Sequence, residues 1–271
     1  MERMRRGFRL LRASWDVLRA DRELLLLPAV SFVAIVIVTA IVGGLAWASG
    51  LGRDRESLRP LDYVFLAILY FVVYFVAIFT NAAVVGAATI RLGGGDPTLR
   101  DGLRLAGSKT GKIVVWAAIS ATVGLILRSL EERLGFLGDI VIGLIGVVWG
   151  AVTFLVVPVL LYEPVGAVDG IKRSASMFRQ RWGEQMTANV AIGLAMVLLA
   201  IPVALVAVLL GVAWLPLGLV VGTIAIGTLV ALGTAVTGVF QAALYRYATT
   251  GESGGSFDAN DLQSSFRPRK A

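Results

Sequence analysis

The chain contains no cysteine and no histidine among its 271 residues. The lack of cysteine excludes disulfides, thiol nucleophiles and thiolate zinc sites. The lack of histidine removes the side chain that most often moves protons near neutral pH. Charged residues are also scarce: they make up 16% of the chain, compared with about 25% in soluble domains. We therefore expect no catalytic site, no metal site and no cofactor, while a membrane-bound enzyme built on carboxylates stays open as an alternative.

Long apolar runs fill most of the sequence, and hydrophobic residues make up 57% of it. A helix needs about 20 apolar residues to cross the hydrocarbon core of a bilayer. Six runs are candidates, at residues 24–49, 61–90, 113–127, 140–162, 186–211 and 215–247. The sequence therefore predicts an all-α polytopic membrane protein, a helical bundle of six transmembrane helices arranged as three hairpins.

Two parts of this pattern leave the number of spans open. The run 113–127 is short for a hydrocarbon core of ~30 Å, although Lys112 and Arg128 at its ends are able to snorkel. A re-entrant segment is the alternative there. The last two runs are joined by the uncharged stretch "GVAWLPLG", in which Trp214 and Pro216 are the best turn signals.

The basic residues are distributed unevenly between the two sides of the predicted membrane. Of the 25 lysines and arginines, 20 lie in the N-terminal segment, the connections after the second and fourth runs, and the C-terminal tail. The remaining connections carry five. By the positive-inside rule, the sequence predicts a protein of the cell (cytoplasmic) membrane with both termini in the cytoplasm.

Two cytoplasmic segments have the pattern of helices that lie in a membrane interface. In residues 4–19, arginines occupy one half of the helical circumference, and Trp15 and leucines occupy the other. In "DGIKRSASMFRQRWGEQ", residues 169–185, Ile171 and Phe178 fall on one apolar stripe beside basic residues. Packing against the other helices is the alternative for these stripes. The residues expected at the lipid interface are Arg5, Arg9, Arg12, Trp15, Lys172, Arg173, Phe178, Arg179, Arg181 and Trp182.

These segments also resemble each other and a weaker third one, "DPTLRDGLRLAGSKTGK". Each contains a glycine, then a large apolar residue and then a basic residue, beginning at Gly7, Gly102 and Gly170. The pattern predicts a single membrane domain, residues 1–250, with three parallel repeats, each an amphipathic helix followed by a transmembrane hairpin. The units are 1–92, 93–164 and 165–250, and residues 251–271 form a polar cytoplasmic tail.

Polar side chains inside the predicted spans are few. Such groups normally face the interior of a membrane bundle, where they either bond between helices or line a path for a solute. The candidates for a cavity are Tyr70, Tyr74, Asn81, Asn189 and Gln241. Acids are nearly absent from the runs and histidine is absent from the chain, whereas ion-coupled transporters usually carry such groups inside their spans.

Small residues form two stripes in the later spans. Gly143, Gly146 and Gly150 fall on one helical face, and Gly218 and Gly222 form a GxxxG motif. Glycines at this spacing let helices approach closely. We interpret both stripes as helix-packing surfaces.

Three blocks carry a resemblance to a known family: "RGFRLLRASWDVLRADREL", "YEPVGAVDGIKRSASMFRQRWGE" and "FDANDLQSSF". The chain resembles a family of uncharacterised six-span bacterial and archaeal integral membrane proteins of unknown function. It is more loosely similar to the membrane domain fused to some glycerophosphodiester phosphodiesterases. The resemblance implies the six-span architecture and no catalytic residues, since the histidine of the phosphodiesterase chemistry is missing from this chain.

The predicted function follows from the basic cytoplasmic face. We expect a non-enzymatic structural or accessory membrane component that contacts the lipid bilayer and its anionic headgroups, or a membrane-protein partner, through this face, and no nucleic acid. The first alternative is a facilitator or transporter for a small or lipid-like solute. The second is a membrane-bound enzyme.

Overall fold

The computed structural model describes residues 2–21, 23–50, 60–180, 185–252, 254 and 257. Every regular element in this part of the chain is a helix. In chain order the helices are α1 (Glu2–Ala20), α2 (Glu23–Ala48), α3 (Pro60–Leu92), α4 (Leu99–Ser108), α5 (Thr110–Thr153), α6 (Val156–Tyr162), α7 (Ala167–Gln180), α8 (Gln185–Ala213) and α9 (Leu215–Thr250).

Five described helical segments are long and apolar enough to cross a membrane. They are Glu23–Ala48, Asp62–Leu92, Thr110–Glu131, Val141–Tyr162 and Leu215–Thr250. In α8 the described apolar part is shorter, Leu198–Ala213. The third predicted span thus belongs to a 22-residue apolar segment, which is longer than the run of apolar letters because the helix continues past its flanking basic residues. By length and composition the chain is a multi-pass membrane protein.

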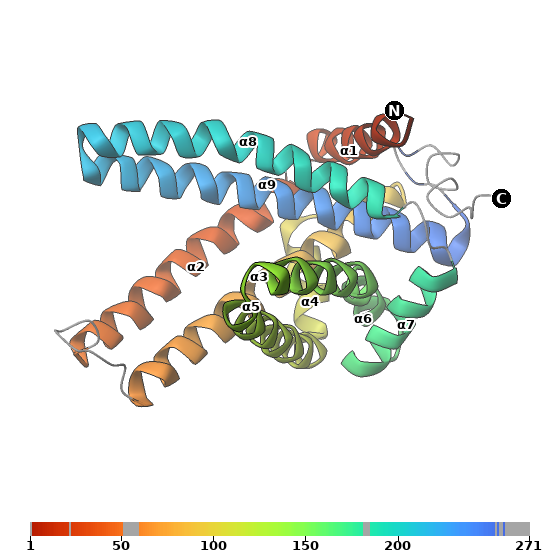
Figure 1. The fold of residues 1–271 in the computed structure, drawn as a ribbon. Coiled ribbons are helices and arrows are strands. Elements are labelled where there is room, and N and C mark those ends of the chain that lie inside the picture. Colours follow the sequence, from red (N-terminus) through yellow and green to blue (C-terminus); the bar gives the residue numbers. More distant parts are fainter. Residues whose placement is uncertain are drawn as a thin grey trace.

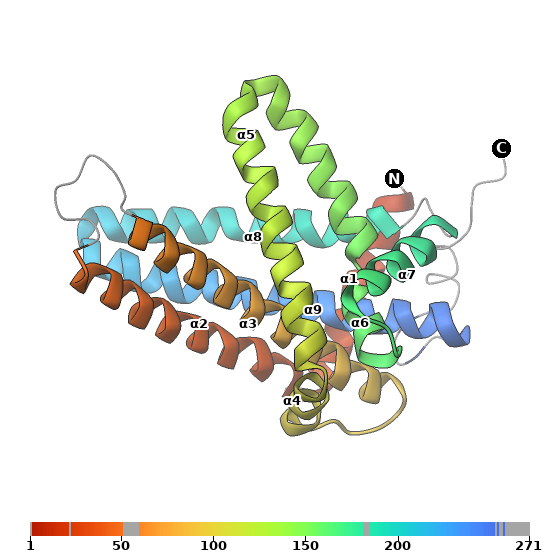
Figure 2. The same ribbon diagram turned by 90° about the horizontal axis from the view of Figure 1, so that it is seen from below.

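Helix α5 turns back on itself. The rings of Trp116 and Trp149 lie 6.1 Å apart between centroids, whereas a straight helix would separate these residues by about 50 Å. Figure 2 shows the two legs of α5 and the turn that joins them. The sharp turn puts the polar stretch "SLEERLGFLGD" at the far end of the pair and leaves the apolar legs facing each other.

The molecule consists of three helical limbs that diverge from a shared base (Figure 1). The limbs are the α2–α3 pair, the two legs of α5, and the α8–α9 pair. The base contains α1, α4, α6 and α7, together with the C-terminal parts of α3 and α9 (Figures 1 and 2). One of the helices α1, α4 and α7 precedes each limb along the chain.

The buried core lies in the base, and the limbs expose their apolar side chains. Among the largest fully buried side chains are Val84, Leu160 and Phe240, from α3, α6 and α9 respectively. Along the limbs, large residues such as Ile41 and Leu209 are exposed. Exposed apolar area on this scale would be unfavourable in water but matches the hydrocarbon of a bilayer.

Glycines of α9 bring its neighbours close, as the GxxxG motif predicts. A Cβ at Gly218 would collide with the backbone of Gly211, and a Cβ at Gly222 would lie 3.1 Å from Ala207 in α8. The turn between these helices is confirmed at Trp214, whose backbone is extended, with proline in the first turn of α9. The interpretation of this stripe as a packing surface is therefore confirmed.

Helix α4 begins with a complete capping box. Asp101 donates its backbone N–H to the Thr98 side chain at 3.3 Å, and the Asp101 carboxylate accepts the backbone N–H of Thr98 at 2.9 Å. The Glu23 carboxylate also accepts the backbone N–H of Leu99 at 2.6 Å, which ties α4 to the start of α2. Hydrogen bonds from the Thr98 side chain and backbone lower the pKa of Asp101 below its ordinary value.

This cap predicts a pH-dependent contribution to stability. Because the pKa of Asp101 is lower in the folded protein, its contribution is present above the ordinary aspartate pKa and is lost as the pH falls through the folded value. We expect Asp101→Asn to lower the thermal midpoint at pH 7 and to have a progressively smaller effect as the pH falls below the ordinary aspartate pKa. Thermal unfolding of both proteins across this range would measure the difference, and a difference that does not depend on pH would contradict the prediction.

Candidate functional site

A cavity of about 380 Å³ lies where α3, α5 and α9 meet. Three of the side chains predicted for a cavity line it, namely Tyr74, Asn81 and Gln241. The structure thus brings together residues that are far apart in the sequence. We call this space the inner cavity. The side chain of the fourth candidate, Asn189 in α8, is outside the described part of the structure, and Tyr70 lines a neighbouring cavity.

Gln241 is held by a break in the neighbouring helix. Pro158 has no backbone N–H, so the carbonyl of Phe154 loses its usual helical donor four residues on. Gln241 Nε2 donates to that carbonyl at 2.8 Å, and this bond fixes the orientation of the amide. The residue is only 6% exposed, and its Oε1 has no hydrogen-bond partner.

Two more polar atoms of the inner cavity are buried without a partner. They are Asn81 Oδ1 and Ser120 Oγ. Ser120 lies in the first leg of α5 and is a cavity residue that the sequence prediction missed. A buried polar atom without a partner costs about 1–3 kcal/mol, and such atoms in native structures are usually satisfied by water or a ligand. The inner cavity therefore presents three polar atoms that need water or a ligand as a hydrogen-bond partner.

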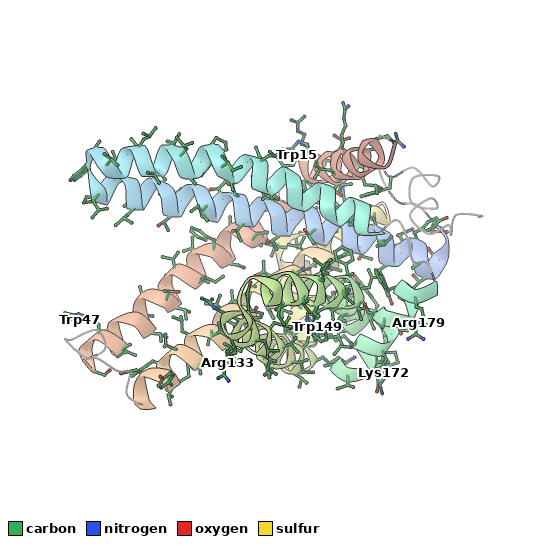
Figure 3. All side chains as sticks on the ribbon, viewed as in Figure 1. Trp15, Trp47, Arg133, Trp149, Lys172 and Arg179 are labelled. Atoms are coloured by element: carbon green, nitrogen blue, oxygen red, sulfur yellow. The ribbon has the colours of Figure 1, made fainter. Side chains whose placement is uncertain are left out.

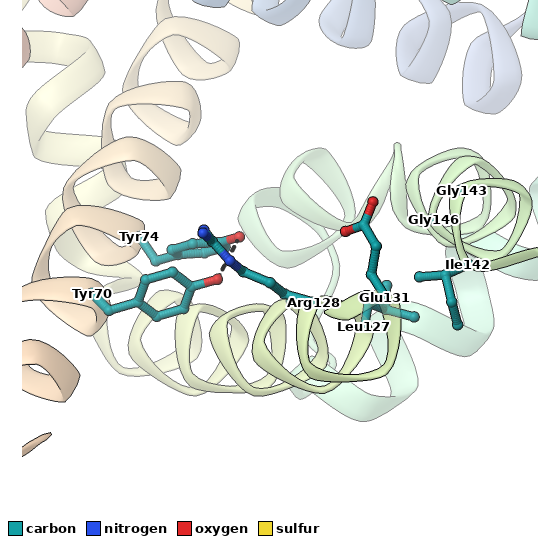
Figure 4. Close-up of a pocket in the computed structure, with 9 residues that line it drawn as sticks. Tyr70, Tyr74, Leu127, Arg128, Glu131, Ile142, Gly143 and Gly146 are labelled. Atoms are coloured by element: carbon teal, nitrogen blue, oxygen red, sulfur yellow. Dashed lines mark hydrogen bonds between the residues drawn. The ribbon is translucent and has the colours of Figure 1, made fainter. Parts of the chain in front are cut away.

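A second, larger cavity of about 730 Å³ continues along α5 (Figure 4). Tyr74 lines both cavities. Its hydroxyl accepts a hydrogen bond from Tyr70 at 3.2 Å, and the side chain of Arg128 extends toward the two tyrosines from the far end of the first leg (Figure 4). We call this space the outer cavity, and the two cavities together the α3–α5 groove.

The glycine stripe of α5 lines this groove and makes no helix contact. A Cβ at Gly143, Gly146 or Gly150 would meet nothing within 4 Å. The first two line the outer cavity and Gly150 lines the inner one. The interpretation of this stripe as a packing surface is therefore wrong, because the second leg of α5 turns its small residues toward open space.

The basic residues expected at the lipid interface lie on the base. Arg9, Arg12, Lys172, Arg173 and Arg179 are exposed, and Figure 3 shows Lys172 and Arg179 on the outer side of α7, away from the limbs. Lys172 pairs with Asp169 at 3.0 Å, and Arg173 Nε binds Glu163 at 3.2 Å. The base thus carries an exposed cationic surface on helices from two separate parts of the chain.

The aromatic residues predicted for the same interface lie deeper. Trp15 is half-buried, and the Arg19 guanidinium lies 5.6 Å from the centre of its ring. Phe178 is 6% exposed, so its ring is enclosed by protein and does not lie in the lipid interface. Arg181 and Trp182 lie outside the described residues, as does the side chain of Arg5.

Ser174 in α7 has a structural role that the sequence pattern of the third repeat did not predict. Its hydroxyl donates to the carbonyl of Val152 at 2.6 Å and accepts the backbone N–H of Leu155 at 3.1 Å. These two backbone groups flank the break between α5 and α6. The same break exposes the carbonyl that binds Gln241, so Ser174 stabilises the geometry of the inner cavity.

Glu163 follows α6 and contacts the helices α5, α7 and α9. Its carboxylate binds Arg173 and accepts a hydrogen bond from the Tyr245 hydroxyl at 3.3 Å. Its backbone carbonyl accepts a hydrogen bond from Lys112 Nζ at 2.9 Å. The two partners of the carboxylate and the exposed position of Arg173 are typical of a structural ion pair.

Comparisons with known proteins show the family of the chain but not its function. Neither a curated protein nor a solved structure matches it at a significant level. The looser likeness to the phosphodiesterase membrane domain gains no support from them and stays a prediction. A family model described as a family of unknown function, DUF6159, matches residues 61–255. Since this match covers well over half of the sequence, from α3 to the end of α9, the chain belongs to the DUF6159 family.

Proposed function

We propose that the protein is a six-span component of the cytoplasmic membrane that binds anionic lipid headgroups through its base. The observation that carries the proposal is the position of the exposed cations. Arginines and lysines of α1, α4 and α7 lie on the base, where each is able to contribute about 1 kcal/mol of attraction to an anionic leaflet. The α8–α9 pair would supply the fifth and sixth spans, and both termini would be cytoplasmic.

Aromatic residues at the opposite ends of the limbs support this orientation. Trp47 is 65% exposed and Trp214 is 62% exposed. Trp47 lies at the far tip of α2 (Figure 3), and Trp214 forms the turn between α8 and α9. Exposed tryptophans gather at membrane–water interfaces. Cations at one end and exposed tryptophans at the other fit a molecule that crosses a bilayer from the base to the limb tips.

Two of the proposed repeats share a packing detail. A Cβ on Gly102 of α4 would lie 2.6 Å from the carbonyl oxygen of Ala83 in the preceding helix α3. A Cβ on Gly170 of α7 would lie 3.0 Å from Leu160 in the preceding helix α6. In both places the aligned glycine lies close to the preceding helix, against backbone at Gly102 and against the end of a leucine side chain at Gly170, which supports the internal repeat.

Lipid preference tests the proposal directly. We expect phosphatidylglycerol to raise the thermal midpoint of the detergent-purified protein more than phosphatidylcholine does. In the triple variant Arg12→Gln, Lys172→Gln, Arg179→Gln this difference should shrink, since loss of about 1 kcal/mol per cation weakens binding about fivefold each time.

A matched triple variant serves as the control. Arg53→Gln, Arg55→Gln and Arg59→Gln remove the same charge from the connection that the positive-inside rule puts on the other side. We expect this variant to keep the preference for phosphatidylglycerol. An equal loss of this preference in both variants would show that it depends only on net charge. If the first triple variant kept the preference, the proposal would be wrong.

A second candidate function is a facilitator or carrier for a lipid-like solute. The observation that favours it is the α3–α5 groove with its buried polar atoms without partners. This candidate does not depend on the cationic base, and the two functions are compatible in one molecule.

A further inference from the structure

The inner cavity presents acceptor atoms that need hydrogen-bond donors from water or a ligand. The Nε2 of Gln241 is already bound to Phe154, so the Oε1 is the atom left without a partner, and it is able only to accept. Asn81 Oδ1 is a second acceptor without a donor, and Ser120 Oγ is able to give or take one bond. The arrangement fits a ligand with two hydroxyl groups, each of which donates to one amide oxygen.

Charged ligand groups are disfavoured in this cavity. None of the described residues that line it is an acid or a base, so an ammonium group would be desolvated without a counter-ion, and a phosphate or carboxylate would face two amide oxygens. Burying a charge without such compensation is costly. The ligand group that fits is uncharged.

The outer cavity provides a path for the chain of such a ligand along Leu127, Ile142, Gly143 and Gly146, and its polar lining comes from Tyr70, Tyr74, Arg128 and Glu131. From Trp116 in the inner cavity to Glu131 in the outer one, the first leg of α5 rises by about 22 Å. One leaflet of a hydrocarbon core is about 15 Å thick, so the groove is long enough for a headgroup and one acyl chain. Gly143 and Gly146 leave room along its wall, because no atom lies within 4 Å of a Cβ built on them.

The groove is also accessible from the side. Ala77 and Gly150 line the inner cavity and are exposed, as are apolar residues on the neighbouring turns of α5, such as Ile145 and Val148. The volumes of the two cavities fall within the range of small-molecule sites, about 300–1,000 Å³. A molecule dissolved in the bilayer would enter without crossing water.

We propose that the α3–α5 groove binds a single-chain amphiphile with an uncharged headgroup that carries two hydroxyls, of the monoacylglycerol class. The hydroxyls bind Gln241 and Asn81, and the acyl chain follows the glycine wall past Tyr74. The proposal goes beyond lipid binding by the base, and it predicts selectivity for a headgroup that the cationic surface does not distinguish.

Three amphiphiles with the same oleoyl chain test the headgroup. The protein is purified in a detergent without hydroxyl groups, such as an alkyl dimethylamine oxide, and its thermal midpoint is measured with 1-monooleoylglycerol, methyl oleate or oleate. A bound ligand stabilises the folded state by mass action. We expect 1-monooleoylglycerol to raise the midpoint by several degrees and the other two to raise it much less. An equal rise with methyl oleate would overturn the proposal.

Variants in the groove locate the site. Asn81→Leu removes an acceptor whose Oδ1 makes no hydrogen bond in the protein, and Gly146→Leu fills the path of the chain. We expect both variants to need at least a tenfold higher concentration of 1-monooleoylglycerol for the same rise in thermal midpoint. Gly44→Leu on α2 is the control, since a Cβ there also meets nothing within 4 Å. A response that survives Gly146→Leu, or that disappears in Gly44→Leu, would overturn the site.

These outcomes are separate from those of the proposed function. Loss of phosphatidylglycerol preference without loss of the monoacylglycerol response would leave the groove in place and remove the cationic base as a lipid site. Loss of the monoacylglycerol response without loss of phosphatidylglycerol preference would support the base as a lipid site and contradict the proposed site in the groove.

Discussion

Replacement of Ser174 by alanine is expected to destabilise the base by about 2–6 kcal/mol. Ser174 is 1% exposed, and its hydroxyl binds the Val152 carbonyl and the Leu155 N–H. Without it, the buried N–H of Leu155 and the half-buried carbonyl of Val152 lose a partner, at about 1–3 kcal/mol each. Water has little access to replace it at this depth. Thermal unfolding of the purified variant would measure the loss.

Ser176→Ala is the matched control for this change. Ser176 lies two residues away in α7, and its hydroxyl binds only the Arg173 carbonyl within its own helix. We expect its thermal midpoint to stay within about a degree of the wild type, since exposed substitutions away from special features cost less than ~0.5 kcal/mol. If Ser174→Ala were as stable as Ser176→Ala, the break between α5 and α6 would not depend on this hydroxyl.

A methyl group on Gly102 is the second change with a large expected effect. In Gly102→Ala the new Cβ would lie 2.6 Å from the Ala83 carbonyl oxygen and 3.3 Å from the Ala87 Cβ. Because the closest atom belongs to the backbone of a buried helix, α4 must move away from α3. Overpacking of this kind costs about 1–3 kcal/mol, which exceeds the ~1 kcal/mol that alanine gains over glycine in a helix.

Gly107→Ala in the same helix gives the opposite expectation. A Cβ at Gly107 would meet nothing within 4 Å, so only the gain in helix propensity remains, and the variant should be slightly more stable than the wild type. Both variants are compared by thermal unfolding in the same detergent. Two variants of equal stability would show that the close approach of α4 to α3 is not required.

The apolar runs predicted the long helices well because a membrane span depends on one property, hydrophobic length. The same reasoning underestimated the third span, since Arg128 ended the apolar run while the helix itself continued. Helical periodicity identified the segments of α1 and α7, but it did not distinguish a stripe that meets lipid from one that meets protein. Phe178 illustrates this: its position on the stripe was clear, and its burial depends on α7 packing against other elements.

The candidate cavity was predicted in part for a similar reason. Tyr74, Asn81 and Gln241 stand out as polar residues inside apolar runs, so composition alone selected them. Ser120 did not stand out, because serine is common in membrane helices and often bonds to its own backbone. The role of the α5 glycines depended on the direction in which the second leg of α5 faces, and a single sequence does not contain this information.

The divergence of the limbs gives the surrounding bilayer a mechanical role. Since the core is concentrated in the base, the spaces between the limb tips would be occupied by acyl chains, and the angle between the limbs would follow the lateral pressure of the membrane. The α3–α5 groove lies between two of these limbs. If the groove binds an amphiphile as proposed, a more tightly packed bilayer would press its walls together, and the occupancy of the groove would then depend on lipid packing as well as on lipid composition.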